Sequence, residues 1–261
     1  MNIGTTPQII LLAIIGSTLP LIASANPPRP DVTWELVKSR DNIRVERGVT
    51  DGSFSAFRGT GVVEASIGRV ISILSDRERA FEWEYKLADA KVLRRTSDRL
   101  VVWQRTSIFF LPCLINDRVF IFVAEATFDE ERKYVRALLR DISDTNIVLS
   151  ESELSVIPDR RCSIKGTLIY TDWQFRPTGP ESTCVRVEVL LRPNGKLKPK
   201  IMRGFEKKWP YSTIQGMRRQ VLKDDIIPHQ EFGGWVAASP ETMITTEDCL
   251  QGILNSDGNN N

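Results

Sequence analysis

Residues 197–223 read LKPKIMRGFEKKWPYSTIQGMRRQVLK and form the longest helix-like segment of the chain. Apolar side chains recur there every three to five residues, which is typical of one face of an α-helix; they are Ile201, Phe205, Trp209, Ile214, Met217 and Val221. A long helix with such bulky residues along one side needs a large surface to pack against. We expect that surface to be a β-sheet, and we expect Pro210 to bend the helix.

The chain before this helix is predicted to supply the sheet. Apolar and polar residues alternate in a series of short segments, as in half-buried strands. The predicted strands are 43–47, 55–63, 91–95, 100–110, 118–128, 133–142, 147–157, 163–175 and 183–192. Short turns separate most of them, so consecutive strands should pair antiparallel. In the last strand, Val185 and Val187 should face one side, and Cys184 and Arg186 the other.

The order of elements predicts the fold class. We also predict two short helices, one at 31–37 capped by Asp31 and one starting after Ser66. An antiparallel sheet must bury one face, and the final helix is the only predicted element long enough to cover it. The sequence therefore predicts an α+β domain in which a curved antiparallel sheet wraps around a long C-terminal helix.

The N-terminus differs in composition from the rest of the chain. Residues 1–28 contain no charged side chain, and an apolar run ends in Ala23-Ser24-Ala25, the small-x-small pattern of a signal-peptidase site. We expect cleavage near Ala25 and export to the periplasm or the medium. A retained membrane anchor is the alternative, although the apolar run is shorter than the ~20 residues that span a bilayer. The predicted parts are a signal peptide at 1–25, a Pro-rich leader at 26–30, a domain at 31–236 and a polar tail at 237–261.

Export places the four cysteines in an oxidising compartment. Four cysteines allow three full pairings, and we rank Cys113 with Cys162 first because both fall in loops at one end of the predicted sheet. For Cys184, a surface thiol and a disulfide are equally compatible with the sequence.

Composition and motifs exclude several functions. Net charge is only +2, which argues against a nucleic-acid binder. The cysteine spacings and the single histidine, His229, do not match a zinc site. The sequence contains no motif of a nucleotide-binding loop or a metalloprotease in its required context. We therefore expect no cofactor and no metal.

Four stretches resemble the START (StAR-related lipid transfer) domains, and together they cover roughly residues 31–228. They are Trp34-Glu-Leu, Phe81-Glu-Trp83 before Ala90–Leu93, Pro112 before Asn116–Phe120, and Trp209-Pro210 with Thr213, Gly216–Arg218 and Gln220-Val221. The resemblance implies a helix-grip fold, a hydrophobic tunnel for one lipid, a C-terminal helix acting as a lid, and no catalysis. One departure is Val119, where the family has an acidic residue.

Nine residues are candidates for contact with a lipid or another hydrophobic small molecule: Trp103, Arg118, Phe120, Phe122, Trp173, Ile201, Phe205, Trp209 and Met217. Plain core packing is the alternative for the apolar ones. Arg118 and Arg105 would hold an anionic headgroup, or else lie in solvent on the convex face of the sheet.

Other expectations concern charges and alternative functions. A hairpin tip at residues 130–131 would place Glu125 opposite Arg136, as a cross-strand pair or as a polar contact inside the tunnel. Basic residues of the long helix would dock transiently on anionic membranes, or are simply solvated; they are Arg203, Lys207, Lys208, Arg218 and Arg219.

We expect a monomer. A module with a filled core, or a cyclase- or aromatase-like enzyme on the same scaffold, are the other functional hypotheses.

Overall fold

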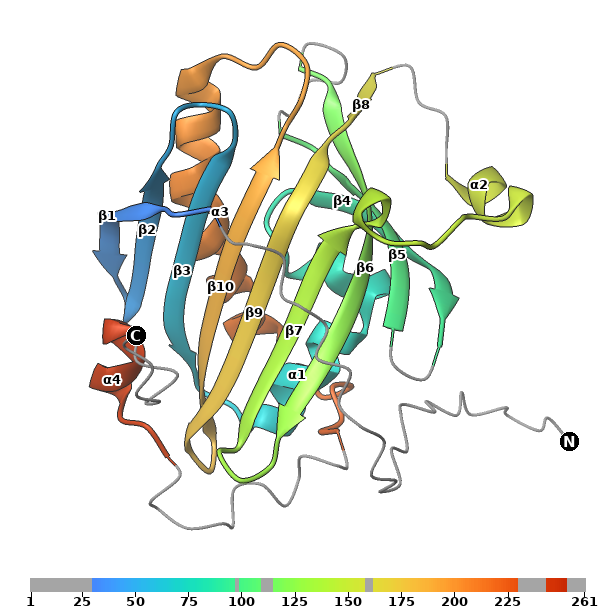
Figure 1. Ribbon diagram of the computed structural model, residues 1–261. Helices are drawn as coiled ribbons and strands as arrows, with labels where there is room; N and C mark the ends of the chain where they lie inside the picture. Colours follow the sequence, from blue (N-terminus) through green and yellow to red (C-terminus); the bar gives the residue numbers. More distant parts are fainter. Residues whose placement is uncertain (1–29, 97–98, 109–114, 158–161, 230–242, 253–261) are drawn as a thin grey trace, which may run out of the picture.

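In the computed structural model, residues 30–96, 99–108, 115–157, 162–229 and 243–252 are described. Within these ranges, ten strands form one sheet in the order β1-β2-β3-β10-β9-β7-β6-β5-β4, with β8 beside β6 (Figure 1). Neighbours on this path pair antiparallel, and β8 pairs parallel with β6. The strands are β1 (Thr33–Arg40), β2 (Ile43–Val49), β3 (Ser55–Val63), β4 (Leu87–Arg95), β5 (Arg99–Thr106), β6 (Asp117–Asp129), β7 (Tyr134–Asp141), β8 (Ser163–Lys165), β9 (Thr167–Gly179) and β10 (Ser182–Arg192).

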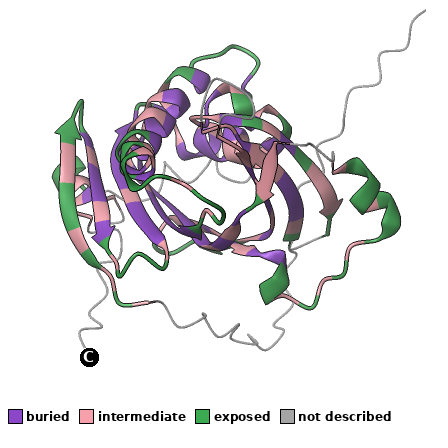
Figure 2. Cartoon of the chain, turned by 90° about the horizontal axis from the view of Figure 1, so that it is seen from above, coloured by how far each residue is buried: buried purple, intermediate pink, exposed green. Residues whose placement is uncertain are grey.

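Helices cover the concave face of this sheet. Helix α3 (Pro199–Gln220) lies along β2 and β3, while α1 (Ile67–Ser75) and the 3₁₀ segment η1 (Arg77–Glu82) cover other parts of the same face. Figure 2 shows the sheet curving around the side that carries α3. The remaining helical elements are η2 (Ile142–Asp144), α2 (Glu151–Val156) and α4 (Thr246–Gln251). The predicted α+β helix-grip fold is confirmed.

The two faces of the sheet bury different residues, because successive side chains of a strand point to opposite sides. Val185 and Val187 of β10 join the main core under α3, whereas Cys184 lies in a separate cluster on the other face. The alternation predicted for this strand is therefore confirmed.

The C-terminal half of α3 is fixed closely to its neighbours. The helix continues through Pro210, which packs on Gly59 of β3; a Cβ added to Gly59 would lie 2.6 Å from the Pro210 Cβ. One turn later, Thr213 Oγ1 accepts a hydrogen bond of 3.1 Å from the backbone N–H of Tyr85. This half of the helix is therefore part of the rigid core.

Two predicted elements are wrong. The helix predicted at 31–37 is strand β1, because its Thr, Trp and Val residues pair at the sheet edge with β2 rather than forming a turn of helix. The strand predicted at 147–157 is a loop followed by α2. Ser150 and Glu153 form a reciprocal capping box there, and this fixes a helix start that the apolar pattern did not reveal.

The predicted Glu125–Arg136 pair is also wrong. Glu125 stands opposite Leu138, and Arg136 stands opposite Thr127, because the turn occupies residues 130–133 and is centred one residue further on than predicted. Glu125 instead forms ion pairs with Arg99 at 3.1 Å and Arg140 at 2.7 Å, and both Glu125 and Arg99 border a cavity between the sheet and its helical cover. It makes a structural pair, as one reading expected, but with different partners.

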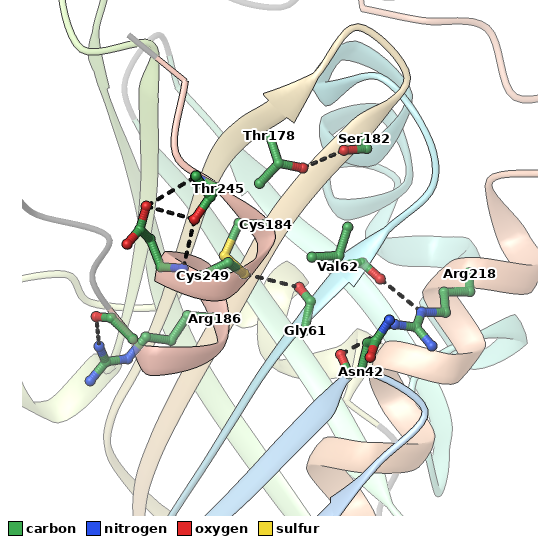
Figure 3. The surroundings of a disulfide bond; sticks show 12 residues. Asn42, Gly61, Val62, Thr178, Ser182, Cys184, Arg186, Arg218, Thr245 and Cys249 are labelled. Atoms are coloured by element: carbon green, nitrogen blue, oxygen red, sulfur yellow. Dashed lines mark hydrogen bonds between the residues drawn. A yellow bond between two sulfur atoms is a disulfide. The ribbon is translucent and has the colours of Figure 1, made fainter. Parts of the chain in front are cut away.

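A disulfide fastens α4 to the convex face of the sheet. Cys184 of β10 is bonded to Cys249 of α4, and both side chains are fully buried (Figure 3). The surface-thiol alternative for Cys184 is therefore wrong. The segment predicted as a polar tail contains this helix, which begins at a capping box formed by Thr245 and Asp248.

The predicted Cys113–Cys162 bond involves Cys113, which lies outside the described residues. Cys162 is itself disulfide-bonded. Of the three pairings that four cysteines allow, the observed Cys184–Cys249 bond belongs to the one that also joins Cys113 to Cys162.

Removing the Cys184–Cys249 bond should destabilise the protein. The two cysteines are 65 residues apart, so the bond closes a long loop and restricts the unfolded chain. We expect the double variant Cys184→Ala/Cys249→Ala to lose about 2–4 kcal/mol of unfolding free energy in urea titrations. Hydrogen exchange in α4 should accelerate most. An unchanged urea midpoint would show that packing alone holds α4.

The predicted signal peptide and most of the leader lie outside the described residues. In the described part of the chain, no helix is both long enough and apolar enough to cross a membrane.

Candidate functional site

Two adjoining cavities lie between the sheet and its helical cover. We name the first the Arg118 cavity; its volume is about 50 Å³, and Phe120, Trp173, Phe205 and Trp209 also line it. We name the second the Phe122 cavity; its volume is about 90 Å³. Its lining is mainly apolar and includes Ile71, Leu74, Phe122, Ala124, Ala126, Phe128, Val135 and Ala137. It also includes Arg95, Arg99 and Glu125, of which the two arginines are exposed.

Three side chains line both cavities and form the division between them: Arg77, Leu139 and Trp173. Trp173 is held by aromatic neighbours, with its ring stacked on Phe175 at 6.0 Å between centroids and edge-on to Trp83 at 6.0 Å. Each cavity is smaller than the 300–1,000 Å³ typical of ligand sites. A lipid would therefore fit only if side chains at this division moved apart.

A buried ion pair lies in the lining of the Arg118 cavity. Arg77 of η1 and Glu84 are 6% and 7% exposed, and their closest charged atoms lie 2.9 Å apart. Arg77 also donates to the Gln104 side chain of β5 at 3.2 Å. The Arg77 Nε has no hydrogen-bond partner among the described residues, although it is buried. Such an atom needs an acceptor, because an unpaired buried donor costs about 1–3 kcal/mol.

Arg118 is the second buried cation of this cavity. It is 2% exposed and is the second residue of strand β6. Its guanidinium donates to the backbone carbonyls of Asn116, Pro193 and Asn194, the last at 3.1 Å. Burial lowers the pKa of Arg118 from its ordinary value. The prediction that Arg118 lies in solvent on the convex face is wrong, because the side chain points into the core.

Arg105 does not join Arg118 in the cavity. It forms an ion pair of 2.6 Å with Asp117, and its side chain keeps part of its exposure. The acid next to Arg118 in the sequence is therefore already engaged. The idea of a headgroup site built from both arginines is not supported by this geometry.

The structure places six of the nine candidate residues in the cavity linings. Arg118, Phe120, Trp173, Phe205 and Trp209 line the Arg118 cavity, and Phe122 lines the second. Met217 is fully buried in the core next to them, and Ile201 is half-buried; neither lines these two cavities. Met202 occupies the lining position that we predicted for Ile201.

Trp103 lies on the other side of the sheet. It alternates along β5 with Gln104, which lines the Arg118 cavity, and Trp103 itself lines neither cavity. It is nevertheless only 2% exposed. The assignment of Trp103 to the lipid site is thus not supported by its position.

Sequence reasoning missed the polar residues of the site. Arg77 and Glu84 fall in a charged segment, residues 76–84, whose pattern indicates a loop or a loose helix and no site. Gln104 gave a usable signal, because it shares the inward face of β5 with Val102 and Thr106, and a polar residue on an apolar face marks an internal site.

In the described residues, no group of three or more His, Cys, Asp or Glu side chains is placed to hold a metal ion.

The fold of this chain also occurs in proteins of known structure. No protein-family model matches the chain. A Pseudomonas aeruginosa protein of uncharacterised function is 22% identical over 191 residues, which cover 73% of this chain and 87% of that protein. Among solved structures, a STAR-related lipid transfer protein from Xanthomonas axonopodis has a TM-score of 0.58 at 16% identity, covering 73% of this chain and 99% of that one. This chain has the START fold.

A second structure supports the same conclusion. Human StAR-related lipid transfer protein 5 matches with a TM-score of 0.59 at 14% identity, over 72% of this chain and 86% of that one. At such low identity the likeness establishes the START fold, while function depends on the residues of the site.

Proposed function

We propose that this protein is an exported lipid-binding or lipid-transfer protein, which holds one amphiphilic lipid between the sheet and α3 and performs no chemical step. The observation that carries the proposal is the pair of cavities, one mainly apolar and one with buried charged groups. An apolar pocket with a few convergent polar groups is the usual design of a small-molecule site. The START fold and the lipid-transfer names of its structural neighbours agree with this proposal.

The route of entry follows from how α3 is held. Its C-terminal half is fixed by Pro210 and Thr213, as described above. Its N-terminal half borders the Arg118 cavity through Met202 and Phe205, and Met202 also lines an open groove beside the β2–β3 hairpin. The Met202 side chain therefore lies between the cavity and the solvent-filled groove. We place the lid at this half of α3.

The same half of α3 carries the surface for a transient membrane contact. Arg203, Lys207 and Lys208 are exposed, and each would contribute about 1 kcal/mol near an anionic surface. Arg218, which we had included, donates instead to the carbonyls of Val62 and Asp41 at 2.8 and 2.7 Å. Arg219 is exposed as well, but it lies near the end of the fixed half. We therefore centre the proposed docking surface on Arg203, Lys207 and Lys208. We propose that the protein acts there as a monomer.

A module with a filled core is the second candidate, and the small volumes of the two cavities favour it. Native mass spectrometry of the purified mature protein separates the two. Lipid binding predicts a co-purifying mass or uptake of added fatty acid, phospholipid or sterol. A protein that stays empty with all three classes would overturn the proposed function.

Phe205→Asp should weaken lipid binding at least tenfold. Phe205 lines the Arg118 cavity and packs edge-on to Phe57 at 6.0 Å between centroids. A carboxylate at this position would face an apolar ligand and bring a desolvation cost well above the ~1.4 kcal/mol that corresponds to tenfold in affinity. Titration with a fluorescent fatty acid measures the effect. Lys207→Ala, on the exposed side of the same helix, is the matched control and should bind normally in solution.

A further inference from the structure

The charges that line the Arg118 cavity do not cancel. The charged residues of its lining are Arg77, Glu84 and Arg118. Arg77 and Glu84 neutralise one another at 2.9 Å, which leaves the positive charge of Arg118. The neighbouring Asp117 is engaged by Arg105 at 2.6 Å. The described lining of this cavity therefore carries one net positive charge.

Arg118 has hydrogen-bond partners but forms no ion pair among the described residues, and Asp117 acts on it only at longer range. Three of its N–H groups donate to the carbonyls of Asn116, Pro193 and Asn194, which hold the side chain in place without neutralising it. An arginine has five N–H donors, so two have no partner among the residues that the structure describes. A buried charge without a partner is costly, and a carboxylate or phosphate oxygen is the acceptor that a guanidinium binds most strongly.

The second cavity limits the apolar part of the ligand. Arg118 lines the first cavity and Phe128 the second, and the two residues are ten positions apart on β6, which corresponds to about 33 Å of strand. One leaflet of a bilayer is about 15 Å of hydrocarbon, half of the ~30 Å core, so one extended chain plus a headgroup fits this length. The narrow division at Trp173 and Leu139 favours one chain over two chains or a rigid ring system.

We infer that the ligand is a single-chain amphiphile with one negative charge, a carboxylate or a phosphodiester, whose headgroup binds Arg118 and whose chain occupies the Phe122 cavity. This inference rests on the proposed lipid-binding function. Arg77 and Gln104 complete the polar end by accommodating the uncharged oxygens of the headgroup. The Arg118 guanidinium is thus the group that selects the charge of the ligand.

Matched ligands test the inference on the delipidated mature protein. Palmitate and 1-hexadecanol share a chain length and differ in charge, while lysophosphatidylglycerol and lysophosphatidylcholine compare a singly anionic with a zwitterionic phosphodiester. We expect each anionic ligand to bind at least tenfold more tightly than its partner in calorimetric titrations. Palmitate and lysophosphatidylglycerol together show which headgroup is preferred. Equal affinity within both pairs would overturn the inference.

Variants of Arg118 locate the selectivity. Arg118→Gln should reduce the palmitate-to-hexadecanol affinity ratio at least tenfold, and Arg118→Lys should retain part of it. Because the readout is a ratio, a general loss of packing that weakens both ligands equally does not imitate the effect. Arg192→Gln removes an exposed charge beside Pro193 and should leave the ratio unchanged. A ratio that survives in Arg118→Gln would overturn the role of Arg118.

The outcomes also separate this inference from the proposed function. Binding of hexadecanol or cholesterol as tight as that of palmitate would retain a lipid-binding protein and reject its charge selectivity. Failure to bind every ligand tested, together with an empty protein in native mass spectrometry, would reject the proposed function itself.

Discussion

Glu84→Leu should lower the free energy of unfolding by about 3–5 kcal/mol, because it leaves the Arg77 charge buried without its counter-ion. Arg77 is 6% exposed, and the Gln104 amide is its only other side-chain hydrogen-bond partner among the described residues. A neutral amide cannot balance a desolvated guanidinium. Urea titration followed by tryptophan fluorescence gives the measurement.

The double variant Arg77→Leu/Glu84→Leu shows why the pair is present. Replacing both charges of a buried pair with apolar residues is often neutral or stabilising, so the double variant should regain most of the stability lost in Glu84→Leu. Its affinity for the lipid headgroup should nevertheless fall if the pair serves the ligand. An exposed control is Arg132→Ala at the β6–β7 turn, which should cost less than about 1 kcal/mol. A double variant as unstable as the single one would contradict this account.

The spacing of apolar residues along the chain predicted the longer elements correctly. Strand β3 has the predicted bounds, and α3 begins and ends within the predicted 197–223. In both, the period of the apolar residues carries the information. The predictions for β1 and α2 were wrong because a short segment has too few residues to distinguish the helical period from the strand period. In these two segments, pairing at the sheet edge sets β1 and the capping box sets α2.

Register and site depend on information that hydropathy does not contain. A shift of two residues between β6 and β7 keeps every side chain on the same face, so the apolar pattern could not detect the error at Glu125. The turn sets this register, and it includes Lys133 with a φ of 52°, a conformation that composition alone did not indicate. Similarly, Arg77 and Glu84 become a site only because η1 packs beside β4 and brings Arg77 to Gln104 of β5, which is a tertiary contact.

Gly216→Val should cost about 4 kcal/mol or more, which is exceptional for a single substitution and diagnostic of its cause. A Cβ built on Gly216 would lie 1.9 Å from the backbone oxygen of Trp83. This neighbour is main chain, so it cannot turn aside as a flexible side chain could, and α3 would have to move away. Denaturant unfolding measures the loss.

Gly204→Val, twelve residues earlier on the same helix, is the matched control. A Cβ at Gly204 would meet nothing within 4 Å, and the position is exposed, so its stability should stay within about 0.5 kcal/mol of the parent. The contrast tests the division of α3 into a fixed and a movable half. Trp83 directly precedes Glu84, so displacing α3 at Gly216 would also disturb the ion pair, and lipid affinity should fall together with stability. Equal losses at both glycines would mean that the helix packs uniformly along its length, and the proposed lid would then lack a fixed half to move against.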